Sequence, residues 1–253
     1  MARIIAIANQ KGGVGKTTTC VNLTFALKKR GRKVLLVDCD AQGNATSGMG
    51  VDKSITPNMY HVLTQGVPAA ECIVHTNYGD VIPTNKDLSG AGVELVDVED
   101  REYVLRQALE PLRDQYDYII IDCPPSLELL TVNALAAADG VLVPVQCEYY
   151  ALEGIADLTT TIKMINARIN PKLEIQGIVL TMYDSRTNFS EQVAAEIRNF
   201  FGDKVYKTVI PRNVRIAEAP SHGKPVIAYD RISRGSSAYL KLAAELVKQI
   251  EHK

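Results

Sequence analysis

The chain has 253 residues, of which 46% are hydrophobic and 23% are charged, and its formal net charge is -1. This composition is typical of a soluble globular protein. With a net charge so close to zero, the overall electrostatic field of the protein does not attract nucleic acid. DNA binding would therefore need a local basic patch, or patches summed by oligomerisation. No apolar run approaches the ~20 residues that span a bilayer, and we expect a cytoplasmic protein.

Short apolar runs alternate with helical patterns along the chain. Strands covered on both faces are predicted at 4–8, 34–38, 118–122, 141–145 and 175–181. Helices are predicted at about 16–30, 100–114, 127–138, 153–168, 189–201 and 235–251. Segment 48–92 carries Gly and Pro around a short helical stretch at 59–63 and is not assigned further.

This alternation predicts an α/β fold in three layers, with a doubly wound, mostly parallel twisted sheet between two layers of helices. No linker or repeat interrupts the chain, so we expect a single domain over residues 1–253. Ligands of such folds bind beyond the carboxyl ends of the strands.

A glycine-rich loop follows the first predicted strand and leads into the first predicted helix. Glycines let successive backbone N–H groups face an anion, and the helix adds the positive end of its dipole. Lys16 can reach the β- and γ-phosphates, and the Thr17 hydroxyl can bind Mg²⁺. We therefore predict a P-loop site for ATP and one Mg²⁺, made by Lys11, Gly12, Gly13, Val14, Gly15, Lys16, Thr17 and Thr18.

Aspartates follow two other predicted strands at the same edge of the sheet. Asp38 ends the second strand, Asp40 lies two residues further on, and Asp122 ends the third. Carboxylates at i and i+2 after a strand can point to one side, towards a metal and a water. An aspartate that ends an apolar strand is the Walker B arrangement, which holds Mg²⁺. Together with the loop, these residues predict ATP hydrolysis by positioning and charge neutralisation.

The loop departs from the ordinary P-loop pattern, because Gln10 replaces a glycine and Lys11 adds a second lysine. This Lys-Gly-Gly-x-Gly-Lys-Thr-Thr pattern is similar to the deviant Walker A loop of the ParA/MinD family of P-loop ATPases. The similarity covers nearly the whole chain, including 38–48, 122–126, 145–154, 209–215 and 219–225. The resemblance implies a Mg²⁺-dependent ATPase of chromosome or plasmid partitioning that is slow without its partner.

The resemblance also implies roles for the site residues. Lys11 would cross a dimer interface and touch the partner's phosphates, and Asp40 would position the attacking water. Asp38 would lie near the Mg²⁺ shell, and Asp122 would be the Walker B carboxylate. Four further residues match family positions: Pro211 and Asn213 line the adenine pocket, and Arg186 and Arg215 are implicated in DNA binding.

The partners that the resemblance implies are a homodimer formed with ATP, double-stranded DNA bound without sequence preference, and a ParB-type centromere-binding protein that stimulates hydrolysis. The protein would then be associated with the nucleoid. Coupling ATP to DNA has a physical reason, because pairing two subunits doubles the phosphate contacts on one duplex. A nucleotide that favours the dimer thereby favours the DNA-bound state.

The basic residues of the C-terminal third give thinner support for DNA binding. Asp203, Glu218 and Asp230 dilute their charge, and scattered lysines and arginines are usually a solvated surface. The residues concerned are Lys204, Lys207, Arg212, Arg215, Lys224, Arg231 and Arg234.

Glu148, Tyr149 and Tyr150 follow the predicted strand 141–145, near the edge where ligands bind. They either shape the dimer face or simply pack. The sequence alone leaves both interpretations open.

Three rival functions need features that are weak in this sequence. A MinD-like ATPase that cycles on a membrane needs an amphipathic tail, whereas this sequence ends soon after the predicted helix 235–251, so we expect no membrane partner. An ATPase similar to the nitrogenase iron protein needs cysteines that bridge an Fe–S cluster, yet the five cysteines include no CxxC pair. An enzyme that phosphorylates or amidates a small substrate needs a second substrate pocket, and none is evident.

Overall fold

The computed structural model describes residues 1–126, 128–148 and 151–251, and for 151–153 it describes the backbone alone. Across this described part, the strands form one eight-stranded sheet in the order β3-β4-β2-β5-β1-β6-β7-β8. Neighbouring strands run parallel, except that β3 is antiparallel to β4. The strands are β1 (Arg3–Ile7), β2 (Val34–Asp38), β3 (Val74–Thr76), β4 (Gly79–Ile82), β5 (Tyr118–Asp122), β6 (Gly140–Gln146), β7 (Glu174–Tyr183) and β8 (Val205–Pro211).

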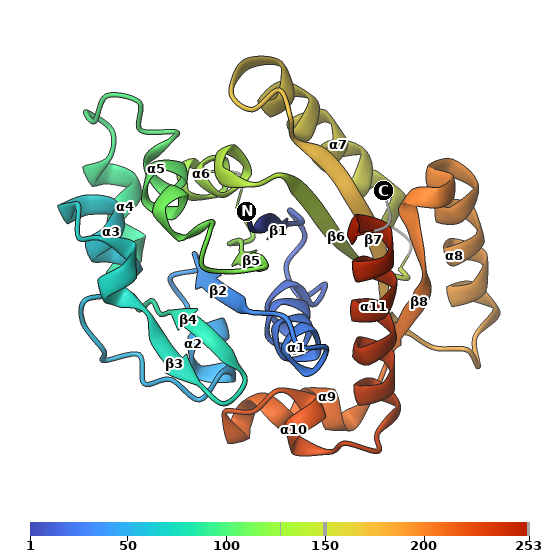
Figure 1. Cartoon of the computed structure of the whole chain (residues 1–253). Helices are drawn as coiled ribbons and strands as arrows, with labels where there is room; N and C mark the ends of the chain where they lie inside the picture. The colour runs from blue at the N-terminus through green and yellow to red at the C-terminus, as the bar shows by residue number, and fades with distance from the viewer. Residues whose placement is uncertain (127, 149–150, 252–253) are drawn as a thin grey trace.

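Helices lie on both sides of this sheet (Figure 1). The α-helices are α1 (Lys16–Lys29), α2 (Asn44–Gly48), α3 (Met59–Gln65), α4 (Leu88–Glu94), α5 (Val104–Leu109), α6 (Leu129–Ala137), α7 (Ala151–Arg168), α8 (Asn188–Phe201), α9 (Val214–Glu218), α10 (Val226–Tyr229) and α11 (Arg234–Glu251). Short 3₁₀ turns are η1 (Ala69–Cys72), η2 (Glu110–Leu112), η3 (Gly202–Lys204) and η4 (Ala219–His222).

Successive side chains along each strand point to opposite faces of the sheet and pack into two separate hydrophobic cores. On β1, Ile5 and Ile7 pack on the face covered by α1 and α11, whereas Ile4 and Ala6 pack on the face covered by α3 to α8. Apolar side chains are therefore needed at every position of a central strand, which explains the continuous apolar runs. The predicted three-layer, doubly wound α/β fold is confirmed, as are the five predicted strands.

The predicted helix 100–114 is wrong at both ends. Asp100 has a φ of 54°, in the left-handed region, and α5 begins only at Val104. Pro111 lacks the N–H that would continue the ladder, and the chain tightens into η2. The predicted helix 127–138 corresponds to α6 (Leu129–Ala137), and its first residue lies outside the described residues.

Two parts of the sheet were not predicted. The unassigned segment 48–92 contains α3, the β3–β4 hairpin and most of α4, and α3 matches the helical stretch expected at 59–63. Strand β8 is an edge strand in which Lys207 and Thr208 interrupt the apolar run. An edge strand with solvent on one side needs fewer apolar residues, so its pattern is weak.

Candidate functional site

The carboxyl ends of β1, β5 and β2 lie side by side and carry the candidate site. Ile7 pairs with Asp122, and Asp122 pairs with Asp38, so the glycine loop and both aspartates meet at one edge. This arrangement is the ligand-binding edge of a parallel α/β sheet.

The glycine loop connects β1 to α1. Gly13 and Gly15 have φ values of 75° and 91°, a conformation in which a residue with a side chain would be strained. The Thr181 hydroxyl, near the end of β7, donates a 2.8 Å hydrogen bond to the Val14 carbonyl and ties the loop to that strand. The loop thus presents backbone N–H groups in front of the first turn of α1.

Lys16 is buried at the first position of α1, with 7% of its surface exposed. Its Nζ donates to the Lys11 carbonyl at 3.2 Å, which curls the side chain back over the loop. Burial lowers the pKa of Lys16, and the negative charge of Asp122 opposes this shift. Because the buried ammonium of Lys16 has lost most of its hydration, an anion bound in the loop would stabilise its charged form.

Lys11 has an ion-pair partner in its own subunit. Its Nζ lies 2.8 Å from Glu148 Oε2, and both side chains are partly exposed. The Gln146 amide donates to Glu148 Oε1, so the carboxylate is held from both sides. Tyr149 and Tyr150, which were expected beside Glu148, lie outside the described residues.

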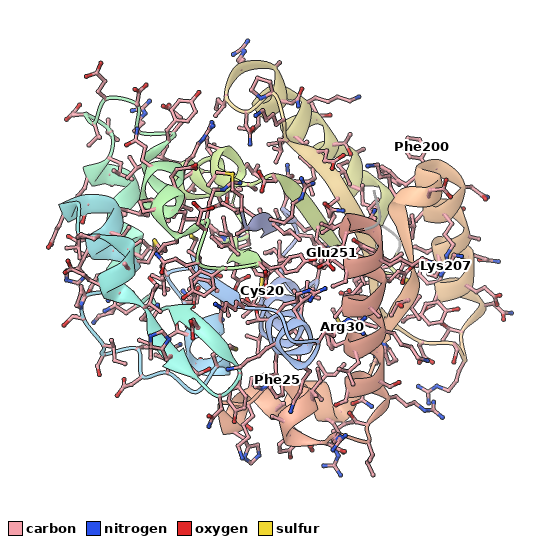
Figure 2. The ribbon with its side chains drawn as sticks, in the orientation of Figure 1. Cys20, Phe25, Arg30, Phe200, Lys207 and Glu251 are labelled. Atoms are coloured by element: carbon pink, nitrogen blue, oxygen red, sulfur yellow. The ribbon has the colours of Figure 1, made fainter. Side chains whose placement is uncertain are left out.

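Asp122 is fully buried at the end of β5. Its Oδ1 accepts from the Cys20 thiol of α1 at 3.3 Å, and Oδ2 has no hydrogen-bond partner in the described part of the chain. Figure 2 shows Cys20 in the centre of the molecule. Burial, followed by the charge of Asp38, raises the pKa of Asp122 well above its usual range, while Thr17 and Cys20 act in the opposite direction. An orphaned buried carboxylate oxygen is suited to a cation.

Asp38 is also fully buried, but its carboxylate is engaged by protein donors. Oδ2 accepts from the Thr46 hydroxyl at 2.7 Å and from the Thr46 N–H at 2.8 Å. Thr46 Oγ1 in turn accepts from the Thr84 N–H at 3.0 Å. The role of Thr46 was not predicted, because a threonine eight residues beyond a strand carries no local pattern.

Asp40 lies on the turn that Asp38 supports. Its N–H donates to Asp38 Oδ1 at 3.2 Å, and its own Oδ1 accepts from the Gln42 N–H at 3.0 Å. The side chain is half-exposed, so one carboxylate is held near the loop yet stays accessible to water.

A cavity of about 370 Å³ opens beside the glycine loop. Gly13, Gly15, Pro211 and Asn213 all line it. Asn213 caps α9 by accepting from the Ile216 N–H at 3.3 Å. The structure therefore brings the two expected adenine residues, Pro211 and Asn213, into one cavity with the glycine loop.

Arg186 and Arg215 lie on different elements and pair with different acids. Arg186, between β7 and α8, makes two hydrogen bonds to Asp184, which holds the pKa of that carboxyl below its usual range. Arg215, on α9, contacts Glu218 at 2.9 Å and Asp230 at 3.3 Å. Both arginines are exposed.

A glycine loop with a buried lysine, facing a buried carboxylate at the end of the neighbouring strand, defines a P-loop ATPase. A family model described as an AAA domain matches residues 2–175. The chain is 55% identical over 249 residues to the sporulation initiation inhibitor protein Soj of Bacillus subtilis, covering 97% of this chain and 98% of the relative. It is 54% identical over 252 residues to the chromosome partitioning protein ParA of Myxococcus xanthus, covering 98% and 89%. The chain belongs to the ParA/Soj family of chromosome-partitioning ATPases.

Solved structures share this fold. Cobyrinic acid a,c-diamide synthase from Mycobacterium smegmatis, with bound ADP and magnesium, has a TM-score of 0.87 and 38% identity, covering 99% of this chain and 96% of that one. The cell division ATPase MinD of Pyrococcus furiosus has a TM-score of 0.81 and 30% identity, covering 98% and 99%. In the described part of this chain, no helix has the length and apolarity to cross a bilayer.

Proposed function

We propose that this partitioning ATPase binds ATP and Mg²⁺, pairs with a second copy over the nucleotides, and holds DNA without sequence preference until hydrolysis releases it. The observation that carries the proposal is the burial of Lys16 beside Asp122, within a loop of backbone N–H donors. Since both cores lie against one sheet, we further propose that residues 1–253 act as one ATPase domain.

The nucleotide would lie along the loop, with its phosphates at Gly12, Gly13, Val14, Gly15, Lys16, Thr17 and Thr18. Its base would enter the cavity lined by Pro211 and Asn213. This placement gives the desolvated ammonium of Lys16 an anionic partner.

The residues present fit a magnesium ion. Asp122 offers a buried oxygen without a partner, and Thr17 on α1 has a hydroxyl next to that carboxylate. Asp38 would lie at the edge of the Mg²⁺ coordination shell, because its Oδ2 already accepts two hydrogen bonds from Thr46. The ion would neutralise charge on the phosphates, and its presence would relieve the repulsion between Asp122 and Asp38.

Hydrolysis would use Asp40 to position the attacking water. Asp38 keeps the Asp40 N–H in place at 3.2 Å, so the catalytic turn is anchored to the end of β2. Positioning of this kind lowers the barrier without covalent chemistry by the protein.

The dimer would join the two glycine loops. A Cβ built on Gly12 meets no atom within 4 Å of its own subunit, so the backbone there is open to an approaching partner. Lys11 would leave Glu148 and reach the partner's phosphates. DNA would contact Arg186 and Arg215, and each arginine would exchange its carboxylate partner for a backbone phosphate.

Phosphate release from ATP tests this function. We expect slow turnover with Mg²⁺ and ATP, and a several-fold rise when duplex DNA and a ParB-type protein are both added. An unchanged rate with both additions would contradict the proposal.

A second candidate is an ATP-dependent enzyme acting on a small substrate. The 38% identity to the M. smegmatis synthase favours it, although the named partitioning relatives are 54% to 55% identical. Turnover that rises with a small acid, but not with DNA and the partner protein, would favour this alternative.

A further inference from the structure

A second cavity, of about 540 Å³, lies between β8 and α11. Lys207 on β8 borders it from one side, and Arg234 and Lys241 border it from α11. Figure 2 shows Lys207 beside α11. Arg234 and Lys241 are seven residues apart on α11, about 10.5 Å along its axis, and so lie on one face of the helix. These three side chains define a basic cleft.

The basic cleft carries positive charge that the protein does not neutralise by ion pairs. All three side chains are exposed, and among the described residues none of them forms an ion pair. The acid on this face of α11, Glu245, accepts from the backbone N–H groups of Lys207 at 2.6 Å and Thr208 at 3.0 Å. Its carboxylate therefore secures the edge strand. Like charges around a concave surface focus the field on an anion.

The basic cleft lies near the arginine expected to bind DNA. The first turn of α11 packs against α9, since a Cβ added at Gly235 would lie 2.5 Å from Ile216. Arg215 is the residue before Ile216, and Arg234 is the residue before Gly235. Arg215, which pairs with Glu218 and Asp230, and the basic cleft thus lie at the same end of α11.

We propose that the basic cleft binds backbone phosphates of duplex DNA, with Lys207 and Lys241 as contacts beyond Arg215. The proposal rests on the proposed function, since it extends the same DNA-binding face. Pro211 lines both the basic cleft and the cavity beside the glycine loop, so the two sites share a wall. The basic cleft would recognise a phosphate group, which either the DNA backbone or free inorganic phosphate could supply.

Fluorescence anisotropy with a labelled duplex, measured with ATP across a salt series, tests the proposal. Lys207→Ala/Lys241→Ala should weaken binding equally for AT-rich and GC-rich duplexes. The slope of log affinity against log salt should fall by about 1 for each lysine lost from the contact. Lys207→Arg/Lys241→Arg should retain most of the binding. Lys163→Ala, an exposed lysine on α7, is the matched control and should leave affinity and slope unchanged.

The other outcomes separate this proposal from the proposed function. If Arg215→Glu abolishes binding while the double alanine variant keeps the wild-type slope, the basic cleft is not a contact and the DNA-binding function stands. If the wild type itself does not bind DNA with ATP, both are overturned. If calorimetry shows that inorganic phosphate binds the wild type but not the double variant, while both proteins bind DNA with the same affinity and slope, the cleft is a free-anion site and the DNA contact is refuted.

Discussion

Lys11 Nζ lies 2.8 Å from Glu148 Oε2 within the same subunit. The lysine that we propose to reach across the dimer interface is therefore paired with a carboxylate of its own subunit. That carboxylate also accepts a hydrogen bond from the Gln146 amide. Dimer formation would have to break this pair before Lys11 could contact the partner's phosphates. Each Glu148 thus opposes the dimer by the free energy of one partly exposed ion pair, and a symmetric dimer breaks two such pairs.

Glu148→Gln should lower the ATP concentration at which half of the protein is dimeric. A partly exposed pair contributes about 0.2–1 kcal/mol, which corresponds to a shift of about 1.4- to 5-fold. Light scattering during an ATP titration measures the shift, and Glu71→Gln, an exposed glutamate on η1, is the control. Dimerisation that is unchanged or weaker in Glu148→Gln would mean that the pair does not restrain Lys11.

Lys16→Ala should weaken ATP binding by about 10- to 150-fold, the loss of one charge-assisted hydrogen bond worth about 1.5–3 kcal/mol. Calorimetric titration with ATP measures this, and Lys33→Ala is a control outside the loop. The nucleotide-free variant should not be less stable than the wild type, because Lys16 is a desolvated cation without its anion. Tight ATP binding by Lys16→Ala would remove the loop from the nucleotide site.

Gly12→Val should bind ATP yet remain monomeric. The new side chain meets nothing in its own subunit and projects to where the partner loop would lie. Gly92→Val on α4, which also has open space around it, is the matched control and should dimerise normally. ATP-dependent dimers of Gly12→Val in light scattering would argue against contact between the loops.

Asp40→Ala should retain ATP and stay dimeric on DNA while its turnover is lost. The substitution removes only the hydrogen bond to the Gln42 N–H, which is worth about 0.5–1.5 kcal/mol, so the fold should persist. Phosphate release and DNA binding are measured on one sample. Wild-type turnover in the variant would exclude Asp40 from the chemistry.

Asp122→Asn should stabilise the nucleotide-free protein and abolish Mg²⁺-dependent turnover. The folded pKa of Asp122 is raised above its ordinary value of 3.8, so the folded state keeps a proton that the unfolded state has lost. Stability of the wild type then falls as the pH rises above that value, until Asp122 ionises in the folded protein. Asparagine removes this dependence.

Thermal melts at about pH 5 and about pH 8.5 measure the effect of Asp122→Asn. The gain in Tm should be larger at the higher pH, at about 2–4 °C for each kcal/mol in a chain of this size. Asp87→Asn, an exposed aspartate, should show no such difference. An equal gain at both pH values would mean that Asp122 is already ionised in the folded state.

The parts of the site that could be predicted from sequence are those whose chemistry is local. The glycine loop, Asp38 and Asp122 each follow a buried strand, and parallel pairing brings strand ends together. What could not be predicted depends on contacts across the fold. Glu148 holds Lys11 from 137 residues away, and Thr181 holds Val14 from 167 residues away. Strand β8 was missed for the same reason, because Tyr206 and Ile210 pack with residues of α11 while Lys207 and Thr208 interrupt the apolar run of this edge strand.

Coupling of ATP to dimerisation and DNA binding is tested by measuring molar mass and DNA binding on the same preparation with ATP, with ADP and without nucleotide. We predict a dimer that binds DNA only with ATP, and binding that falls steeply with salt. A mass and a DNA affinity that do not change with the nucleotide would contradict it.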